Sequence, residues 1–234
     1  MTSIRIRVRK GGCGARPIAC TRPLAAVIPV WTALIASCAP GDPPATQTAE
    51  DFSFGFTLGN SDAPVKVMEF SDYGCGYCRQ FHLETFGMVK EEFIDTGKVQ
   101  WTFVPFVNGL FTGSREVTAG VHCAAQQDPE KFERLNADLW SEQQAWRRGV
   151  DPEALIRGLA GRAAIDLAAY DECIDADRGG VMVDDQTRLA GQLGIRGTPT
   201  FLIDGFYPLQ GTRPPEIFRD FLTAAHREVT RGEG

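Results

Sequence analysis

Beyond its first 37 residues the chain has little positive charge, with 18 Lys and Arg against 30 Asp and Glu. This part therefore has a net charge of about −12, which we interpret as a contribution to solubility. A nucleic-acid-binding protein needs a basic surface to neutralise phosphates. We therefore expect no nucleic acid among the partners.

The N-terminal region lacks an apolar run long enough to span a bilayer comfortably. Six basic and no acidic residues are followed by an uncharged stretch, Leu24–Ser37, about as long as the apolar part of an export signal. The chain has no internal repeat, and its 234 residues allow one domain of ordinary size behind such a signal.

The end of the uncharged stretch resembles the lipobox of bacterial lipoproteins. Ile35-Ala36-Ser37-Cys38 has the aliphatic residue, the two small residues and the cysteine that becomes lipid-modified. The resemblance implies a lipoprotein signal peptide at 1–37 and a lipid anchor on Cys38, facing the periplasm or the cell exterior. The alternative is an ordinary signal peptide cut near the same place. Residues 38–58 are rich in Pro and Thr and predict a flexible tether, with a possible short strand near 52–58.

Seven cysteines are present, and four of them fall in the predicted domain at 59–234. Cys13 and Cys20 would leave with the signal and Cys38 would carry lipid. An even number then remains in a compartment where disulfides persist.

The predicted elements follow the order strand, helix, strand, a helical block at about 106–193, two strands and a helix. Alternating or continuous apolar runs predict the strands, and apolar residues at helical spacing predict the helices. Asp-Pro-Glu at Asp128 and at Asp151 gives two helix starts. This order is that of an α/β, thioredoxin-like fold with a large helical insertion. The predicted strands are 65–70, 99–104, 197–204 and 206–210, and the predicted helices are 75–96, 112–127, two starting near 129 and 152, 166–175, 180–193 and 214–230.

Cys75-Gly76-Tyr77-Cys78 lies where a strand ends and a helix begins. Free N–H groups and the dipole of a helix start stabilise a thiolate at the first cysteine. We expect Cys75 to be exposed and acidic, and Cys78, one turn further, to be buried. Half of a zinc site and an inert disulfide are the alternatives. Zinc needs two more ligands, and no second closely spaced pair is present.

Two segments resemble bacterial DsbA-like thiol–disulfide oxidoreductases. They are Asp62–Cys78, with the strand and the cysteine pair, and Gly197–Gly205. The resemblance covers about 59–230. It implies that Pro199 is a cis-proline facing the disulfide and that Thr198 offers backbone contacts to an extended substrate. It also implies that Glu69 is a buried acid that moves a proton to or from Cys78; a carboxylate satisfied by other partners is the alternative. The cysteines carry the chemistry, so no cofactor is expected.

The sequence departs from the DsbA pattern between the cysteines, where Gly76-Tyr77 replaces Pro-His. Without that imidazole, the thiolate of Cys75 should be less stabilised and the disulfide less oxidising. Cys-Gly-Tyr-Cys with a Thr before the proline resembles DsbC-type isomerases. Those carry an N-terminal dimerisation domain, which residues 39–58 are too short to form.

Cys123 and Cys173 fall in predicted helices of the insertion, and we expect a structural disulfide between them. A second redox pair or two buried thiols are the alternatives. His82, one turn beyond Cys78, is predicted to lie on the helix surface.

These observations predict an enzyme that forms or exchanges disulfides in exported polypeptides with cysteines, through the redox-active pair Cys75 and Cys78. A membrane redox partner is implied. The alternatives are a protein-disulfide reductase or isomerase, and a lipoprotein that binds a metal such as copper, or a partner protein, without turnover.

Overall fold

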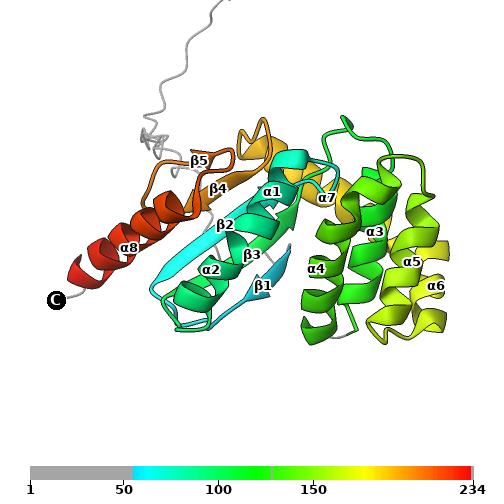
Figure 1. Cartoon of the computed structure of the whole chain (residues 1–234), viewed down its shortest axis with the longest axis horizontal. Coiled ribbons are helices and arrows are strands. Elements are labelled where there is room, and N and C mark those ends of the chain that lie inside the picture. The colour runs from blue at the N-terminus through cyan, green and yellow to red at the C-terminus, as the bar shows by residue number, and fades with distance from the viewer. Residues whose placement is uncertain (1–54, 128, 233–234) are drawn as a thin grey trace, which may run out of the picture. The chain divides into compact units, whose positions relative to one another are not determined.

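The computed structural model describes residues 55–127 and 129–232 of the 234 (Figure 1). The predicted signal peptide, Cys38, most of the predicted tether and the helix cap at Asp128 lie outside this part. The description below concerns the unit that contains the predicted domain.

The sheet has five strands in the order β1-β3-β2-β4-β5. β2 and β3 are parallel, and the other neighbours are antiparallel. The predicted strands are present, although the last is only two residues long. β1 is the possible short strand expected near 52–58, within the segment predicted as a tether, so the sheet begins at Phe56. The strands are β1 (Phe56–Leu58), β2 (Val65–Ser71), β3 (Val99–Pro105), β4 (Thr200–Ile203) and β5 (Leu209–Gln210).

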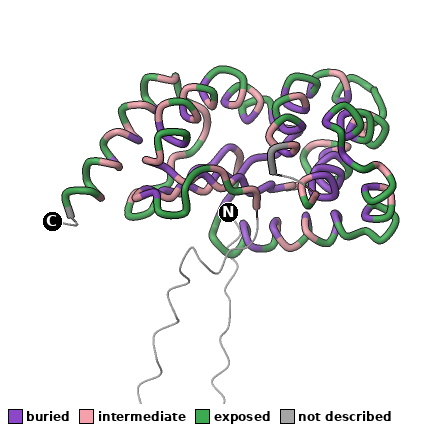
Figure 2. The backbone as a smooth tube through the Cα atoms, turned by 90° about the horizontal axis from the view of Figure 1, so that it is seen from below, coloured by how far each residue is buried: buried purple, intermediate pink, exposed green. Residues whose placement is uncertain are grey.

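Alternation along β2 sends its side chains to two different cores. Val65 and Val67 pack with residues of α1 (Gly76–Glu84), α2 (Phe86–Val89) and α8 (Pro215–Gly232). Phe70 packs on the opposite face, with Ala190 of α7 (Arg178–Gln192). Figure 2 shows the buried positions concentrated along the strands and on the inner sides of the helices. Glu69 follows Val67 by two positions on β2, so its side chain shares the face of Val67 and points beneath α1.

The single helix predicted over 75–96 is divided into three pieces. α1 and α2 are followed by a π-helical turn, η2 (Lys90–Ile94), and Gly97, with a φ of 72°, lies in the turn before β3. The break between α1 and α2 is at Thr85, with φ −122° and ψ −40°, and the wider π-helical turn follows α2.

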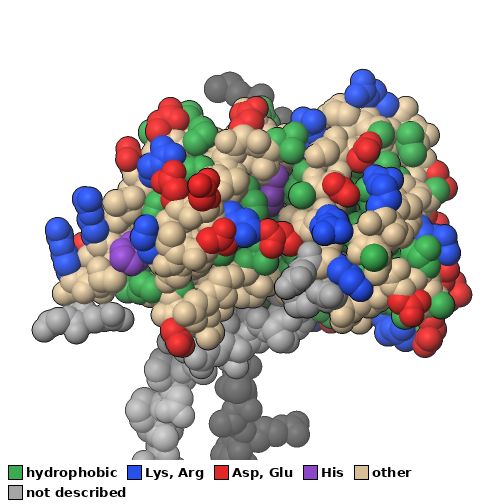
Figure 3. Space-filling view, turned by 60° about the horizontal axis from the view of Figure 1, so that its bottom comes forward, with side chains coloured by type: hydrophobic (Ala, Val, Ile, Leu, Met, Phe, Trp, Pro, Cys, Tyr) green, Lys and Arg blue, Asp and Glu red, His purple; other side chains and the backbone are tan. Residues whose placement is uncertain are grey.

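The predicted insertion is a block of helices beside the sheet (Figure 1). Besides α7 it comprises α3 (Ser114–Ala125), α4 (Pro129–Trp146), α5 (Pro152–Arg162) and α6 (Leu167–Asp175). Its core is continuous with Tyr73, Cys75 and Cys78, so the insertion covers the cysteine pair. Within the described residues, no helix is long and apolar enough to cross a membrane. Acidic and basic side chains are interspersed on the face seen in Figure 3.

Candidate active site

Cys75 is the N-cap residue of α1. Its backbone is extended, with φ −77° and ψ 124°, and its carbonyl accepts the first helical hydrogen bond, from Arg79 N. Its Sγ lies 3.4 Å from the carbonyl oxygen of Thr198. The prediction that Cys75 is exposed is wrong, because the helical block and the Thr198 loop leave only 5% of the residue accessible.

The pKa of Cys75 is lowered to about 5, and the hydrogen bond with the Cys78 thiol is the largest cause. Hydrogen bonds from the Thr198 side chain and from the N–H groups of Cys78 and Tyr77 lower the pKa further, against the opposing effect of burial. The start of the helix therefore stabilises a thiolate on this sulfur, as the sequence predicts.

Cys78 is completely buried, and burial raises its pKa well above that of a free thiol. The neighbouring Cys75 raises it further, while hydrogen bonds from the Ser71 side chain and the Asp72 N–H act in the opposite direction. Both thiols are in the reduced form. The pair thus combines one acidic sulfur at the helix start with one that retains its proton.

Thr198 and Pro199 approach this pair from the loop that leads into β4. The Thr198–Pro199 peptide bond is cis. This loop brings the Thr198 carbonyl next to Cys75, although 123 positions separate the two residues in the sequence.

Glu69 is fully buried on β2 and has three hydrogen-bonding partners. Trp101 Nε1 donates to Oε2 at 2.9 Å, and Oε1 contacts both Ser71 Oγ and His82 Nε2, the latter at 2.7 Å. The prediction of a surface position for His82 is therefore wrong. Its side chain is 3% exposed because residues four apart share a helix face, and Cys78 already defines that face as buried.

Three polar side chains of the helical block, Gln143, Asn136 and Ser114, hydrogen-bond to the segment that carries the cysteines, and no sequence pattern predicted them. Gln143 Nε2 donates to the carbonyl oxygens of Tyr73 and Cys75, at 2.7 and 2.8 Å. Tyr73 donates to Asn136, and burial raises its pKa. Asp72 Oδ1 accepts from Gly74 N and from Ser114, and burial raises the pKa of Asp72 to about 6.

Cys123 of α3 and Cys173 of α6 form a disulfide across the helical block, with their Cα atoms 5.6 Å apart. It is separate from the Cys75–Cys78 pair, whose sulfurs remain thiols. Among residues 55–127 and 129–232, no three His, Cys, Asp or Glu side chains are grouped to hold a metal ion.

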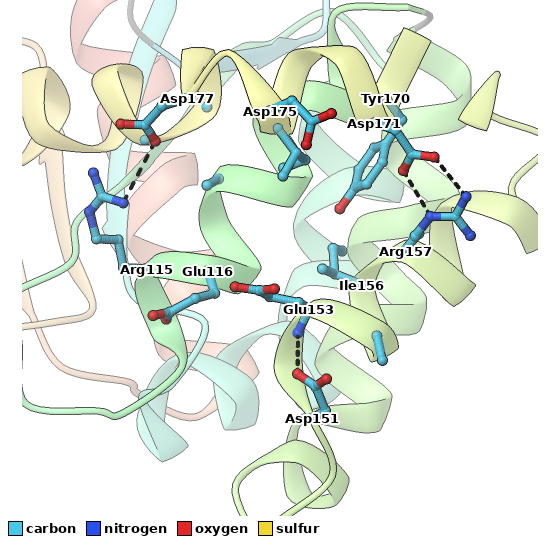
Figure 4. Close-up of a pocket in the computed structure, with 15 residues that line it drawn as sticks. Arg115, Glu116, Asp151, Glu153, Ile156, Arg157, Tyr170, Asp171, Asp175 and Asp177 are labelled. Atoms are coloured by element: carbon cyan, nitrogen blue, oxygen red, sulfur yellow. Dashed lines mark hydrogen bonds and ion pairs between the residues drawn. The ribbon is translucent and has the colours of Figure 1, made fainter. Parts of the chain in front are cut away.

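A cavity of about 690 Å³ lies between α3, α5, α6 and α7 (Figure 4). Tyr170 points into it, and Arg157 and Arg115 on its wall pair with Asp171 and Asp177. None of its lining residues belongs to the cysteine site.

A cysteine pair at the start of the first helix after a strand of this mixed sheet defines a class, the thioredoxin-like oxidoreductases. Comparison with known proteins identifies the family within this class. The sequence model of the family described as Thioredoxin matches residues 54–222. The chain belongs to this family, and the predicted fold is confirmed.

Its relatives include DsbA-like disulfide oxidoreductases. "Disulfide bond formation protein D" of Bacillus subtilis (strain 168) is 30% identical over 154 residues, which are 63% of this chain and 66% of that protein. The match thus spans just under two thirds of that relative. The solved structure of BdbD from Bacillus subtilis (oxidised) has 25% identity and a TM-score of 0.67, over 74% of this chain and 93% of that one. Wolbachia pipientis alpha-DsbA1 shares the fold, with 22% identity, a TM-score of 0.69 and coverage of 80% and 100%.

Proposed function

We propose that the protein forms or exchanges disulfides in exported polypeptides through Cys75 and Cys78. The observation that carries this proposal is the contrast between the two sulfurs, because Cys75 has a lowered pKa and Cys78 a raised one. A low-pKa sulfur is a good leaving group in disulfide exchange. The name of the Bacillus relative points in the same direction.

The reaction starts from the oxidised pair. A client thiolate attacks Cys75 Sγ, the Cys75–Cys78 bond breaks, and Cys78 leaves and takes up a proton. A second client thiolate then attacks the client sulfur of the mixed disulfide and releases Cys75 as a thiolate. Two electrons pass from the client thiols to the pair, and a membrane redox partner would remove them again.

The neighbouring residues take supporting roles in this proposal. Thr198 offers its backbone to an extended client and Pro199 shapes that surface, because the loop carrying both reaches Cys75. Glu69 exchanges a proton with Cys78, to which it is connected through Ser71. No cofactor takes part.

A refolding assay tests the function. The oxidised protein should convert a reduced, unfolded client to its disulfide-bonded form, and its own pair should become reduced in equal amount. The double variant Cys75→Ser/Cys78→Ser, which keeps the Cys123–Cys173 bond, is the control and should transfer nothing. Reduction of insulin without oxidation of the reduced client would favour the reductase alternative. If both reactions fail and the reduced protein binds a metal ion, the alternative of a metal-binding protein without turnover would be favoured.

The location is a further proposal, and it rests on the sequence before residue 55. Removal of residues 1–37 would leave Cys38 as a lipid-bearing N-terminus that holds the domain at a membrane, facing the periplasm or the exterior. Cys38→Ala should then release a soluble, exported domain, because no acyl chains remain. Mass spectrometry of the mature chain checks this, and an unmodified N-terminus at another residue contradicts it. Cys20→Ala is the matched control and should leave the anchor intact.

A further inference from the structure

The buried sulfur of Cys78 is connected to a row of polar side chains under α1. Besides the Cys75 thiol, its side-chain hydrogen-bonding partner is the Ser71 hydroxyl, which also contacts Glu69 Oε1. Cys78, Ser71 and Glu69 are each 0% exposed. Cys78 therefore has no direct contact with water, and Ser71 and Glu69 offer its proton a route outward.

The surroundings of Glu69 indicate which of its oxygens takes part. Oε2 accepts a hydrogen bond from Trp101 Nε1, and an indole N–H can only donate. Oε1 instead lies between Ser71 Oγ and His82 Nε2. A hydroxyl and an imidazole nitrogen can each donate or accept. Proton movement through Glu69 is thus restricted to Oε1.

His82 is held at the end of this row. Its ring stacks on Trp140, with ring centroids 4.4 Å apart and planes inclined by 11°, and Phe81 lies against it at 5.3 Å. Its side chain is 3% exposed, so it is the member of the row with some access to solvent. Imidazole has a nitrogen on each side of the ring, and one can receive a proton while the other releases one.

We propose that Ser71, Glu69 and His82 form a proton path between Cys78 and solvent, with His82 at its outer end. The path rests on the proposed function and deepens it. When the disulfide forms, Cys78 gives its proton to Ser71 Oγ, Ser71 gives its own to Glu69 Oε1, Oε1 gives one to His82 Nε2, and Nδ1 gives one to water. One proton leaves Cys78 and one reaches solvent. The Cys78 thiolate then attacks Cys75 Sγ. Reduction of the pair runs the path inward.

The experiment separates the two sulfur steps with a chromogenic aromatic disulfide, dithiobis(nitrobenzoic acid). The Cys75 thiolate attacks it, forming Cys75–S–S–aryl and releasing one aryl thiolate. Cys78 then loses its proton and attacks Cys75 Sγ, which releases a second aryl thiolate and leaves the Cys75–Cys78 disulfide. Stopped-flow absorbance follows both releases. Cys75→Ser/Cys78→Ser supplies the background from thiols outside the pair.

His82→Gln places an amide where Nε2 lies, so it can still donate to Glu69 but cannot relay a proton. It should slow the second release about a hundredfold or more, the usual size of a proton-transfer contribution, and leave the first unchanged. Ser71→Ala interrupts the row at its other end and should do the same. Gln80→Ala, on the exposed side of α1, is the matched control and should alter neither release.

A pH profile separates proton transfer from packing. In His82→Gln the second release should accelerate as pH rises, because hydroxide that enters during transient opening of the site can then deprotonate Cys78. The wild-type rate should change less. The other ionisable side chains around the row are retained in every variant. Tyr73 lies near Glu69, and Asp72 and Cys75 lie beside Cys78. Arg79 donates a hydrogen bond to the Trp140 carbonyl oxygen.

Wild-type rates of second release in both His82→Gln and Ser71→Ala would overturn the path. Equal slowing of both releases, with the same pH profile as the wild type, would also overturn it and assign these residues a packing role. If the wild-type protein itself gives no second release, the pair does not form a disulfide, and the proposed function fails before the path is in question.

Discussion

Replacing Cys75 with serine should abolish disulfide exchange, whereas replacing Cys78 with serine should produce a protein that traps its clients. The difference follows from the positions of the two sulfurs. Cys75, at the start of α1, forms the mixed disulfide, and Cys78 is the buried thiol that would resolve it in the reducing direction. Without Cys78 the mixed disulfide should accumulate and be visible on non-reducing gels. Without Cys75 no such band should form.

Alkylation of the reduced wild-type protein checks the same assignment by pH. A thiolate reacts and a thiol does not, so the rate rises as pH rises through the pKa. With a pKa of about 5 instead of the ordinary 9.0, Cys75 should already react fully near neutral pH. The raised pKa of Cys78 should keep that sulfur unreactive there. Peptide mapping that finds Cys78 modified first below neutrality would contradict the assignment.

The fold could be predicted from the sequence because its strands and helices have strong local patterns. The apolar run at 65–70, the break before Cys75 and the alternation at 99–104 each identify an element without knowledge of the rest. The shortness of β5 and the π-helical turn at Lys90–Ile94 were not predicted, because both depend on packing between distant parts of the chain. Local pattern cannot report such packing.

The candidate site could be predicted only in part, for the same reason. The cysteine pair and the Thr198–Pro199 segment are sequence motifs, so both were found. His82 was misplaced because its polarity was given more weight than its position one turn after Cys78. That spacing was the available signal, since Cys78, Phe81 and His82 all lie on the inner side of α1. Gln143 and Asn136 had no local signal, because they reach the site from α4, more than sixty residues away.

Removal of the Cys123–Cys173 disulfide should give the largest loss of stability. The bond joins α3 to α6 and closes a loop with a sequence separation of 50 residues, which includes α4 and α5. In the chain-entropy account, a cross-link of this span restricts the unfolded chain and stabilises the fold by about 4 kcal/mol. For a domain of this size the melting temperature should fall by roughly 10 °C in the double variant Cys123→Ala/Cys173→Ala. Differential scanning calorimetry measures both quantities.

The same double variant separates a structural bond from a second redox pair. Both cysteines lie within helices, without the helix-start position that stabilises a thiolate on Cys75, so we expect no exchange with client sulfurs there. The initial rate of client oxidation by Cys75 and Cys78 should therefore be unchanged at temperatures well below the new melting point. A mild dithiol should reduce the Cys75–Cys78 bond first and leave Cys123–Cys173 intact. An unchanged melting temperature with a reduced oxidation rate would contradict the structural role. The Cys123–Cys173 bond would then take part in electron transfer, and the stability of the helical block would come from its packed apolar core alone.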